Sequence, residues 1–275
     1  MSSSRSVPVV IAGLPGSVGR ALVVALQGVE DLHLVPIGLT SARHAGTVHE
    51  QAGAQVQLVD ASTFDRHPLP EGAVVVDFSI PDAVVPNVER YCAAGVPFVL
   101  GTSGDRIAEA TALVVKSEVA AVIGANMAIP VILLQAAVAH LAETYPGAMQ
   151  GGTLAIRESH QVTKRDISGT ARAMLPDLAA LGLPAGVERI EVVRDEGLAR
   201  AWGVPDAHLA GHAYHDFVLD DVSGTASLGL STRVHGRAVY AQGALAAVRY
   251  LVGQVANGAR GRVFSMVDVL RGQAS

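Results

Sequence analysis

Residues that can move protons and bind anions are concentrated in one segment, 158–171, which reads ESHQVTKRDISGTA. His160 titrates near neutral pH, so it can accept or donate a proton during a reaction. Lys164 can pair with an anion, or deliver a proton where it is partly desolvated. The segment follows a predicted strand and leads into a predicted helix. It is therefore a candidate catalytic site, and a capped helix after a polar loop is the alternative interpretation.

Three residues at the end of this segment favour anion binding. Ser168, Gly169 and Thr170 stand directly before the predicted helix. Hydroxyl groups and consecutive backbone N–H groups at a helix N-terminus form a site that suits a carboxylate. The pattern thus indicates an acidic group on the molecule that binds there.

A second candidate site is the glycine turn GLPGSVG at residues 13–19. It lies between a predicted strand and a predicted helix, as the phosphate-binding turn of a dinucleotide-binding domain does. Gly13 would permit the tight turn, Gly16 the close approach of backbone to phosphate, and Gly19 the packing of helix on sheet. The helix N-terminus adds free N–H groups and the positive end of a dipole. The spacing differs from the usual G-x-G-x-x-G, so a glycine-rich turn without a nucleotide is the alternative.

The segment after the second predicted strand indicates which dinucleotide is bound. An acidic residue there binds the ribose 2′-hydroxyl of NAD, whereas an arginine accommodates the 2′-phosphate of NADP. Here the segment contains Thr40, Ser41 and Arg43, and no acid appears before Glu50. NADPH is therefore the predicted cofactor and NADH the alternative. Arg43 as an ordinary surface cation is the competing interpretation.

Other candidate sites are weaker. His208, His212 and His215 have a spacing that resembles a zinc site. The last two lie at a predicted strand, where an odd spacing directs side chains to opposite faces, so no metal site is predicted. No G-x-S-x-G surrounds a serine, which argues against a common class of hydrolases. Cys92 is expected to be inert packing.

The elements that position these residues alternate in the first part of the chain. Apolar runs, most of them followed by a stretch that can form a helix, predict strands at 9–12, 33–38, 54–58, 73–77, 97–100 and 120–123. Continuous β-branched runs suit parallel strands covered on both faces. The alternation predicts an α/β fold with a Rossmann-like, doubly wound parallel sheet. This dinucleotide-binding domain is predicted to comprise residues 1–126 together with 240–275.

The pattern changes after residue 126. A long apolar helix is predicted at 129–144, one further clear helix at 171–181, and strands with more alternation at 153–158, 190–194, 212–219 and 225–234. This order predicts a second, α+β domain at 127–239, built on a mixed or antiparallel sheet. We expect this domain to bind the substrate and to form the oligomer interface.

Composition excludes several classes of protein. Half of the 275 residues are apolar and 16% are charged, so the chain can bury a large core and is not disordered. A net charge of −5 and an aromatic content of 4% argue against nucleic-acid binding. Apolar stretches are too short to predict a membrane span. A single cysteine and an N-terminus without an apolar leader predict a cytoplasmic protein.

Taken together, the motifs resemble the 4-hydroxy-tetrahydrodipicolinate reductase family, also called the dihydrodipicolinate reductases. The resemblance runs in order along the chain, from the glycine turn through VVVDFS, GTSG at 101–104 and GANM at 124–127 to the 158–171 segment. GVPDAHLAGHAYH, RVHGRAVYAQGAL and FSMVDVL also resemble it. The details are similar to the plant-type branch, which carries ESHQ and a shortened D-x-SGTA. The commoner bacterial pattern has two adjacent histidines, followed later by Asp-Ala-Pro.

The resemblance implies roles for particular residues. His160 would donate and accept the proton, Lys164 would donate one, and Ser168 to Thr170 would bind a substrate carboxylate. Arg237 would be a further substrate-binding residue. Gln161 replaces the second histidine of the family, and it can hydrogen-bond the substrate but cannot protonate it.

The cofactor contacts that the resemblance implies follow four of the predicted strands. They are Gly13, Leu14, Pro15, Gly16, Ser17, Val18, Phe78, Gly101, Thr102, Ser103, Ala125, Asn126 and Met127.

The implied activity is hydride transfer from NAD(P)H to a cyclic, dicarboxylated imine in the diaminopimelate route to lysine. No metal is implied, and a homodimer or homotetramer is expected because the family is oligomeric. The alternatives are a reductase of a different cyclic imine and an NADPH-binding protein without catalytic activity. The presence of His160 and Lys164 together with Ser168 to Thr170 favours an enzyme.

Overall fold

The computed structural model describes residues 6–273, which form two compact units. The first unit contains residues 6–127 and 240–273, and the second is Ala128–Val239. Each unit has its own sheet and its own hydrophobic core. Within residues 6–273, no helix is long and apolar enough to cross a membrane.

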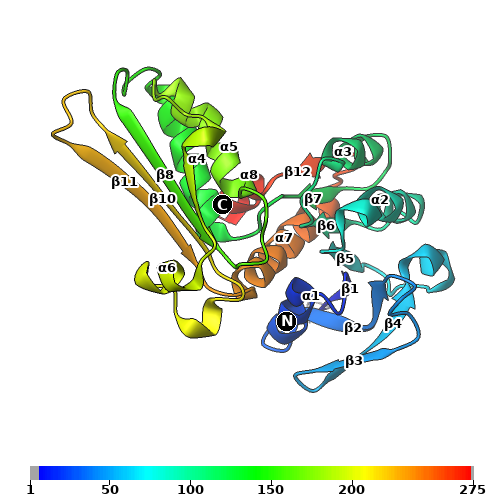
Figure 1. The fold of residues 1–275 in the computed structure, drawn as a ribbon. Helices are drawn as coiled ribbons and strands as arrows, with labels where there is room; N and C mark the ends of the chain where they lie inside the picture. The colour runs from blue at the N-terminus through cyan, green and yellow to red at the C-terminus, as the bar shows by residue number, and fades with distance from the viewer. Residues whose placement is uncertain (1–5, 274–275) are drawn as a thin grey trace. The chain divides into compact units, whose positions relative to one another are not determined.

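The first unit is built on an eight-stranded sheet in the order β12-β7-β6-β5-β1-β2-β4-β3 (Figure 1). The strands are β1 (Val7–Ala12), β2 (Leu32–Thr40), β3 (Val48–Gln51), β4 (Ala54–Asp60), β5 (Val74–Asp77), β6 (Phe98–Leu100), β7 (Ala121–Ile123) and β12 (Val263–Phe264). Neighbouring strands are parallel except β3 and β4, which form an antiparallel pair. The predicted Rossmann-like class is confirmed.

Five α-helices belong to this unit within the described residues. They are α1 (Ser17–Leu26), α2 (Val84–Ala93), α3 (Ile107–Val115), α7 (Ala238–Ala256, from residue 240 on) and α8 (Met266–Gln273), with short 3₁₀ helices at Ala61–Arg66 and Pro81–Ala83. Strands β5, β6 and β7 are buried along their whole length. Their continuous apolar runs fold as strands because both faces of the sheet are covered.

Strand β3 is an element that the sequence does not predict. It is the polar run VHEQ at the edge of the sheet, and half of its residues are exposed. It pairs with β4 through a tight turn in which Ala52 and Gly53 have φ values of 51° and 80°. An edge strand needs no apolar face, so its sequence lacks the apolar pattern that reveals the other strands.

The second unit has a four-stranded sheet in the order β11-β10-β8-β9. Its strands are β8 (Thr153–His160), β9 (Ile190–Val193), β10 (Ala213–Asp220) and β11 (Ser227–Val234), and its helices are α4 (Ile129–Thr144), α5 (Gly169–Ala180) and α6 (Glu196–Ala201), with 3₁₀ helices at Val187–Arg189 and Asp206–His208. Strands β8 and β9 are parallel and the other pairs are antiparallel. The predicted mixed sheet is confirmed, whereas α6 was not predicted. This short helix begins where the Asp195 carboxylate accepts a 2.8 Å hydrogen bond from the Leu198 N–H.

The register of β8 on β10 decides which side chains enter the core of this unit. Ile156 lies opposite Phe217, and both are buried in the core that α4 and α5 also line. Two positions further along, Glu158 lies opposite His215. His160 is on the same face because side chains alternate along a strand. The inner face of the sheet is therefore apolar at one end and polar at the other.

Candidate active site

The glycine turn after β1 is built from backbone that approaches other backbone closely. Gly13 has a φ of 103°, and a Cβ on it would lie 2.5 Å from the Phe78 carbonyl oxygen. A Cβ on Gly16 would lie 2.6 Å from the Gly13 carbonyl oxygen. A Cβ on Gly19 would lie 3.1 Å from the Leu14 side chain. Glycine is thus required at the first two positions, and α1 begins directly after them at Ser17.

A cavity of about 430 Å³ lies at the carboxyl ends of β1, β2 and β5. Seven residues with a predicted cofactor contact line it: Gly13, Leu14, Pro15, Gly16, Thr40, Ser41 and Phe78. Seven others that the sequence does not single out also line it: Leu39, His44, Ala61, Ser79, Ile80, Ala83 and Asn87. Parallel α/β sheets bind their ligands at this edge.

The other predicted cofactor residues follow the same edge without lining this cavity. Ser17, Val18 and Gly19 form the first turn of α1, Gly101, Thr102 and Ser103 follow β6, and Ala125, Asn126 and Met127 follow β7. A Cβ on Gly101 would lie 2.2 Å from the Phe78 ring. Phe78 therefore packs directly on the backbone of the turn after β6.

The predicted 2′-phosphate residues divide into two kinds. Thr40 is buried, and its hydroxyl donates a 2.6 Å hydrogen bond to the Leu14 carbonyl. Its hydroxyl proton is thus used to shape the glycine turn. Ser41 and Arg43 are exposed, and Ser41 lines the cavity together with His44. A phosphate contact at this position therefore depends on Ser41 and Arg43.

A buried carboxylate braces the turn after β5. Asp77 accepts hydrogen bonds from the Ser79 N–H at 2.7 Å, the Asn87 amide at 3.0 Å and the Tyr91 hydroxyl at 2.8 Å. Burial, and then the Asp77 carboxylate, raise the pKa of Tyr91 well above its ordinary value, so the phenol remains a donor. Local sequence patterns do not single out these residues. Only the buried aspartate in VVVD hints at them, because a buried carboxylate needs partners.

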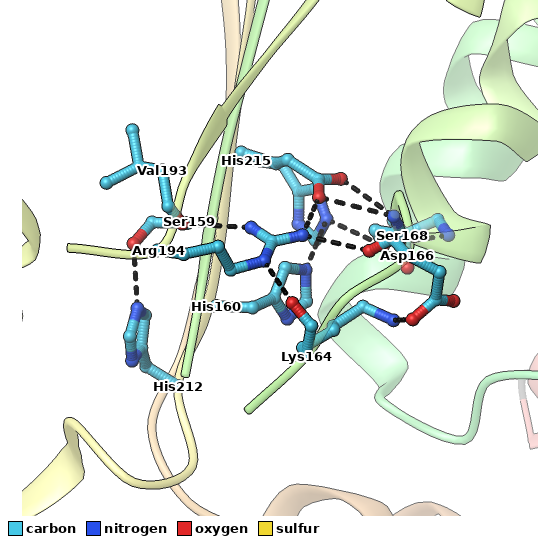
Figure 2. Close-up of polar contacts among 11 residues, drawn as sticks. Ser159, His160, Lys164, Asp166, Ser168, Val193, Arg194, His212 and His215 are labelled. Atoms are coloured by element: carbon cyan, nitrogen blue, oxygen red, sulfur yellow. Dashed lines mark hydrogen bonds and ion pairs between the residues drawn. The ribbon is translucent and has the colours of Figure 1, made fainter. Parts of the chain in front are cut away.

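The polar segment of the second unit is held by Arg194, which follows β9 (Figure 2). The Arg194 guanidinium lies 2.5 Å from the fully buried Glu158 carboxylate. It also donates hydrogen bonds to the carbonyl oxygens of Lys164 at 2.8 Å and Asp166 at 3.0 Å. One buried ion pair therefore fixes the path of the backbone through the whole loop.

The loop ends at a capped helix, as predicted. The Ser168 N–H donates to both Glu158 carboxylate oxygens, at 3.2 and 3.0 Å. The Ser168 hydroxyl oxygen accepts from the Thr170 N–H at 3.1 Å, which makes Ser168 the N-cap of α5. The N–H of Gly169, at the exposed first position of α5, has no partner within the helix, since first-turn N–H groups lack an acceptor there. It is the N–H of this turn best placed to meet an anion.

The two predicted catalytic side chains differ in charge. The Lys164 ammonium pairs with Asp166 at 2.9 Å, and its hydrogen bond holds the pKa of the Asp166 carboxyl below the ordinary value. His160 is buried, and burial first, then the neighbouring His215, Arg194 and Lys164, lower its pKa to about 2. At neutral pH His160 is therefore neutral, with an unprotonated ring nitrogen, whereas Lys164 is paired with a carboxylate.

The three histidines with metal-like spacing contact different partners and do not converge on one point. His212 contacts the Ser159 hydroxyl at 2.7 Å on the outer face of the sheet, and His215 contacts the Ser168 hydroxyl at 3.0 Å on the inner face. The predicted opposite orientation is confirmed. His208 instead stacks on His235, with ring centroids 5.0 Å apart.

A different set of potential metal ligands does come together. Ligand atoms of Glu158, His160 and His215 lie within 4.8 Å of one another. The Glu158 carboxylate is already engaged by Arg194 and by the Ser168 N–H. A metal ion would have to displace a cation, so this donor set does not favour one.

The remaining predicted substrate residues lie at two places in the second unit. Gln161 is half-buried and directly follows β8. Arg237 is half-buried in the turn between β11 and α7. A Cβ on Gly211 would lie 4.0 Å from the Arg237 guanidinium, so the loop before β10 packs beside this arginine.

The first unit has a Rossmann-like sheet with a glycine turn, and the second carries a histidine, a lysine and a capped helix N-terminus. Together these features define a class of protein. This class is the pyridine-nucleotide-dependent oxidoreductases. The pattern of "Dihydrodipicolinate reductase, N-terminus" matches residues 7–127, and that of "Dihydrodipicolinate reductase, C-terminus" matches residues 130–270. The chain belongs to the dihydrodipicolinate reductase family.

Individual relatives agree with this assignment. The chloroplastic 4-hydroxy-tetrahydrodipicolinate reductase 2 of Arabidopsis thaliana is 33% identical, over 98% of this chain and 79% of its own. The 4-hydroxy-tetrahydrodipicolinate reductase of Thiobacillus denitrificans is 31% identical, over 96% of this chain and 98% of its own. The structure of a dipicolinate-bound dihydrodipicolinate reductase from Paenisporosarcina sp. TG-14 matches the fold with a TM-score of 0.59 at 16% identity, covering 94% of this chain and 97% of that one.

Proposed function

We propose that this reductase converts 4-hydroxy-tetrahydrodipicolinate to tetrahydrodipicolinate with NADPH, in the diaminopimelate route to lysine. The observation that carries the proposal is the loop between β8 and α5. It holds a neutral histidine, a lysine ammonium and a capped helix N-terminus on one frame, Arg194 with Glu158. The matches to both halves of the family support it.

The glycine turn and its neighbours fit a dinucleotide. Side chains at Gly13 and Gly16 would fill the space that the backbone needs, and the first turn of α1 is open to a pyrophosphate. When bound there, the nicotinamide supplies a hydride. We assign the 2′-phosphate to the exposed Ser41 and Arg43, which favours NADPH over NADH.

The substrate is a cyclic dicarboxylate, so it needs cationic and N–H donors. We assign one carboxylate to the start of α5, where the Gly169 N–H and the positive end of the helix dipole are available. Lys164 and Arg237 supply the cations, and Gln161 a neutral hydrogen bond. Since Lys164 already pairs with the exposed Asp166, the substrate anion competes with that carboxylate for the ammonium.

The conversion replaces a hydroxyl group by hydrogen and releases water. A proton must therefore reach the departing oxygen, in addition to the hydride at carbon. The Lys164 ammonium that pairs with Asp166 can supply such a proton, and neutral His160 offers a ring nitrogen for proton exchange. We assign proton delivery to Lys164 and proton exchange to His160.

The test is a coupled assay in which the synthase makes the substrate in place and oxidation of the reduced nicotinamide is followed by absorbance. We expect rapid oxidation that depends on the synthase, and a lower KM for NADPH than for NADH. Oxidation with another cyclic imine but not with this substrate would identify a different imine reductase. Binding of NADPH without oxidation of it would identify a non-catalytic protein.

Assembly and location are further proposals. We infer a homodimer or homotetramer in the cytoplasm, with the second unit forming the interface. Light scattering on the purified chain measures its mass, and a monomer would contradict the proposed assembly.

A further inference from the structure

A second imidazole reaches His160 from another strand. His215 lies on β10 opposite Glu158, and only 1% of its surface is exposed. Its Nε2 atom is 3.4 Å from Nε2 of His160, and the two rings meet edge to face with centroids 5.2 Å apart (Figure 2). The same Nε2 atom lies 3.0 Å from the Ser168 hydroxyl. His215 thus joins the histidine to the helix cap.

All three hydrogen bonds around His215 are satisfied when its proton is on Nδ1. The Ser168 hydroxyl oxygen accepts from the Thr170 N–H, so its own proton is free to be donated to His215 Nε2. The other nitrogen, Nδ1, lies 3.4 Å from the Thr232 hydroxyl, which can accept its proton. His215 is then an Nδ1–H tautomer with a lone pair on Nε2.

The Ser168 hydroxyl and His160 share this single lone pair of Nε2, and this arrangement selects the tautomer of His160. Two Nε2 atoms can form a hydrogen bond only if one of them is an N–H, and His160 must supply it here. The proton of neutral His160 then resides on Nε2, and its lone pair is on Nδ1. Within residues 6–273, Nδ1 of His160 has no hydrogen-bond partner, so this atom is available to a reacting group.

We propose that His215 is a positioning residue for the reduction, which holds His160 as the Nε2–H tautomer so that Nδ1 exchanges the proton. This inference rests on the proposed function, in which His160 takes part in proton transfer. An orienting partner of this kind has a large effect on rate, because the wrong tautomer presents an N–H where a lone pair is needed.

The surroundings of His215 keep its ring neutral, as this role requires. Burial first, then Arg233 of β11 and Arg194 after β9, lower its pKa to about 4, and Lys164 acts in the same direction. Asp216, its neighbour on β10, opposes them. Glu158 faces the ring but is engaged by Arg194. At neutral pH the ring is an acceptor at Nε2 rather than a cation.

The first experiment examines the unaltered protein without substrate. The ¹⁵N imidazole spectrum at neutral pH distinguishes protonated from unprotonated ring nitrogens, and the His160 signals are assigned by their loss in His160→Asn. We expect His160 protonated at Nε2, and a change in this pattern in His215→Leu. A His160 ring protonated at Nδ1, or a pattern that does not respond to His215→Leu, would overturn the proposal.

The second experiment measures turnover in three variants. His215→Leu removes the acceptor, His215→Gln returns a carbonyl acceptor on a side chain of similar reach, and His212→Leu is the control, since it removes a buried histidine from the other face of the same region. We expect kcat to fall about 10-fold or more in His215→Leu, with partial recovery in His215→Gln. The KM for NADPH should stay within about 2-fold in all three. Equal losses of kcat in His215→Leu and His212→Leu would show a structural role only.

The two experiments separate this inference from the proposed function. If the unaltered protein does not reduce the substrate, the proposed function fails, and the ¹⁵N spectrum still decides whether His215 selects the His160 tautomer. If the unaltered protein is active and His215→Leu keeps its kcat, the inference fails alone. Should His215→Leu not fold, His215→Gln and the spectrum of the unaltered protein decide the matter.

Discussion

At the scale of single residues, the two side chains proposed to transfer protons differ in charge and in burial. Lys164 holds a proton on an ammonium that Asp166 pairs with, whereas buried His160 is neutral. Replacing Lys164 with alanine should therefore lower kcat by about 100-fold or more, because the departing oxygen loses its proton source. The KM for NADPH should change little, since the cofactor residues lie in the other unit. Steady-state kinetics in the coupled assay measure both, and near-normal turnover would remove Lys164 from the mechanism.

Residue types revealed part of this site and concealed the rest. His160, Lys164 and Ser168 stand within a few positions of one another, so a scan for chemistry finds them in one segment. Arg194 comes 36 positions after its partner Glu158, and His215 comes 55 positions after His160. Such pairs depend on strand order and register, which local composition does not encode. The alternation of β10, with His215 on the apolar face of Phe217, was the available signal.

At the scale of elements, the loop between β8 and α5 depends on one buried ion pair. Arg194→Met should destabilise the protein by about 3–5 kcal/mol, because the fully buried Glu158 carboxylate loses its counterion. The double variant Glu158→Gln with Arg194→Met should be less destabilised than Arg194→Met alone, since no buried charge is left unpaired. Denaturant unfolding of both variants gives the comparison. A double variant that is less stable than the single one would contradict this account of the loop.

The glycine turn after β1 requires a residue without a side chain at Gly13. Gly13→Ala places a Cβ 2.5 Å from the Phe78 carbonyl at a φ of 103°, so it should cost about 2 kcal/mol or more and weaken NADPH binding at least about 10-fold. Gly53→Ala is the matched control, with a similar φ of 80° and nothing within 4 Å of its Cβ. Calorimetric titration with NADPH measures the affinities. Equal affinities in the two variants would argue against a cofactor at this turn.

The predictability of elements follows from how much apolar surface they bury. The runs that become β5, β6 and β7 are buried throughout and were predictable from composition. The edge strand β3 and the six-residue helix α6 bury little, so their local sequences carry weak signals. Helix α1 begins at Ser17, directly after Gly16, which is its N-cap.

At the scale of the whole molecule, three buried histidines with a lowered pKa, His160, His212 and His215, link stability to pH. The folded-state pKa values of His160 and His215 are lowered to about 2 and about 4 from an ordinary value of 6.5. Below pH 6.5 these histidines bind protons in the unfolded chain but remain neutral in the folded chain. Their contribution to stability is therefore fully present above pH 6.5 and falls as the pH decreases toward 4. Carboxyls with lowered pKa, such as Asp31 and Asp166, contribute only near and below their ordinary value of 3.8.

Denaturant unfolding between about pH 7 and about pH 4 measures this dependence. The protein should lose stability as the pH decreases across the range, and His215→Gln should lose less because one of the three histidines is gone. A variant with the same slope as the unaltered protein would show that other groups cause the loss.

The central claim is that hydride replaces the hydroxyl of a cyclic dicarboxylate in this protein, with the proton supplied by the chain. The most direct measurement uses NADPH with both hydrogens at the reactive nicotinamide carbon replaced by deuterium, together with substrate made in place by the synthase. The account predicts tetrahydrodipicolinate that carries a single deuterium, at the carbon that lost its hydroxyl. Product without deuterium, or consumption of the cofactor with no change in the substrate, would contradict it.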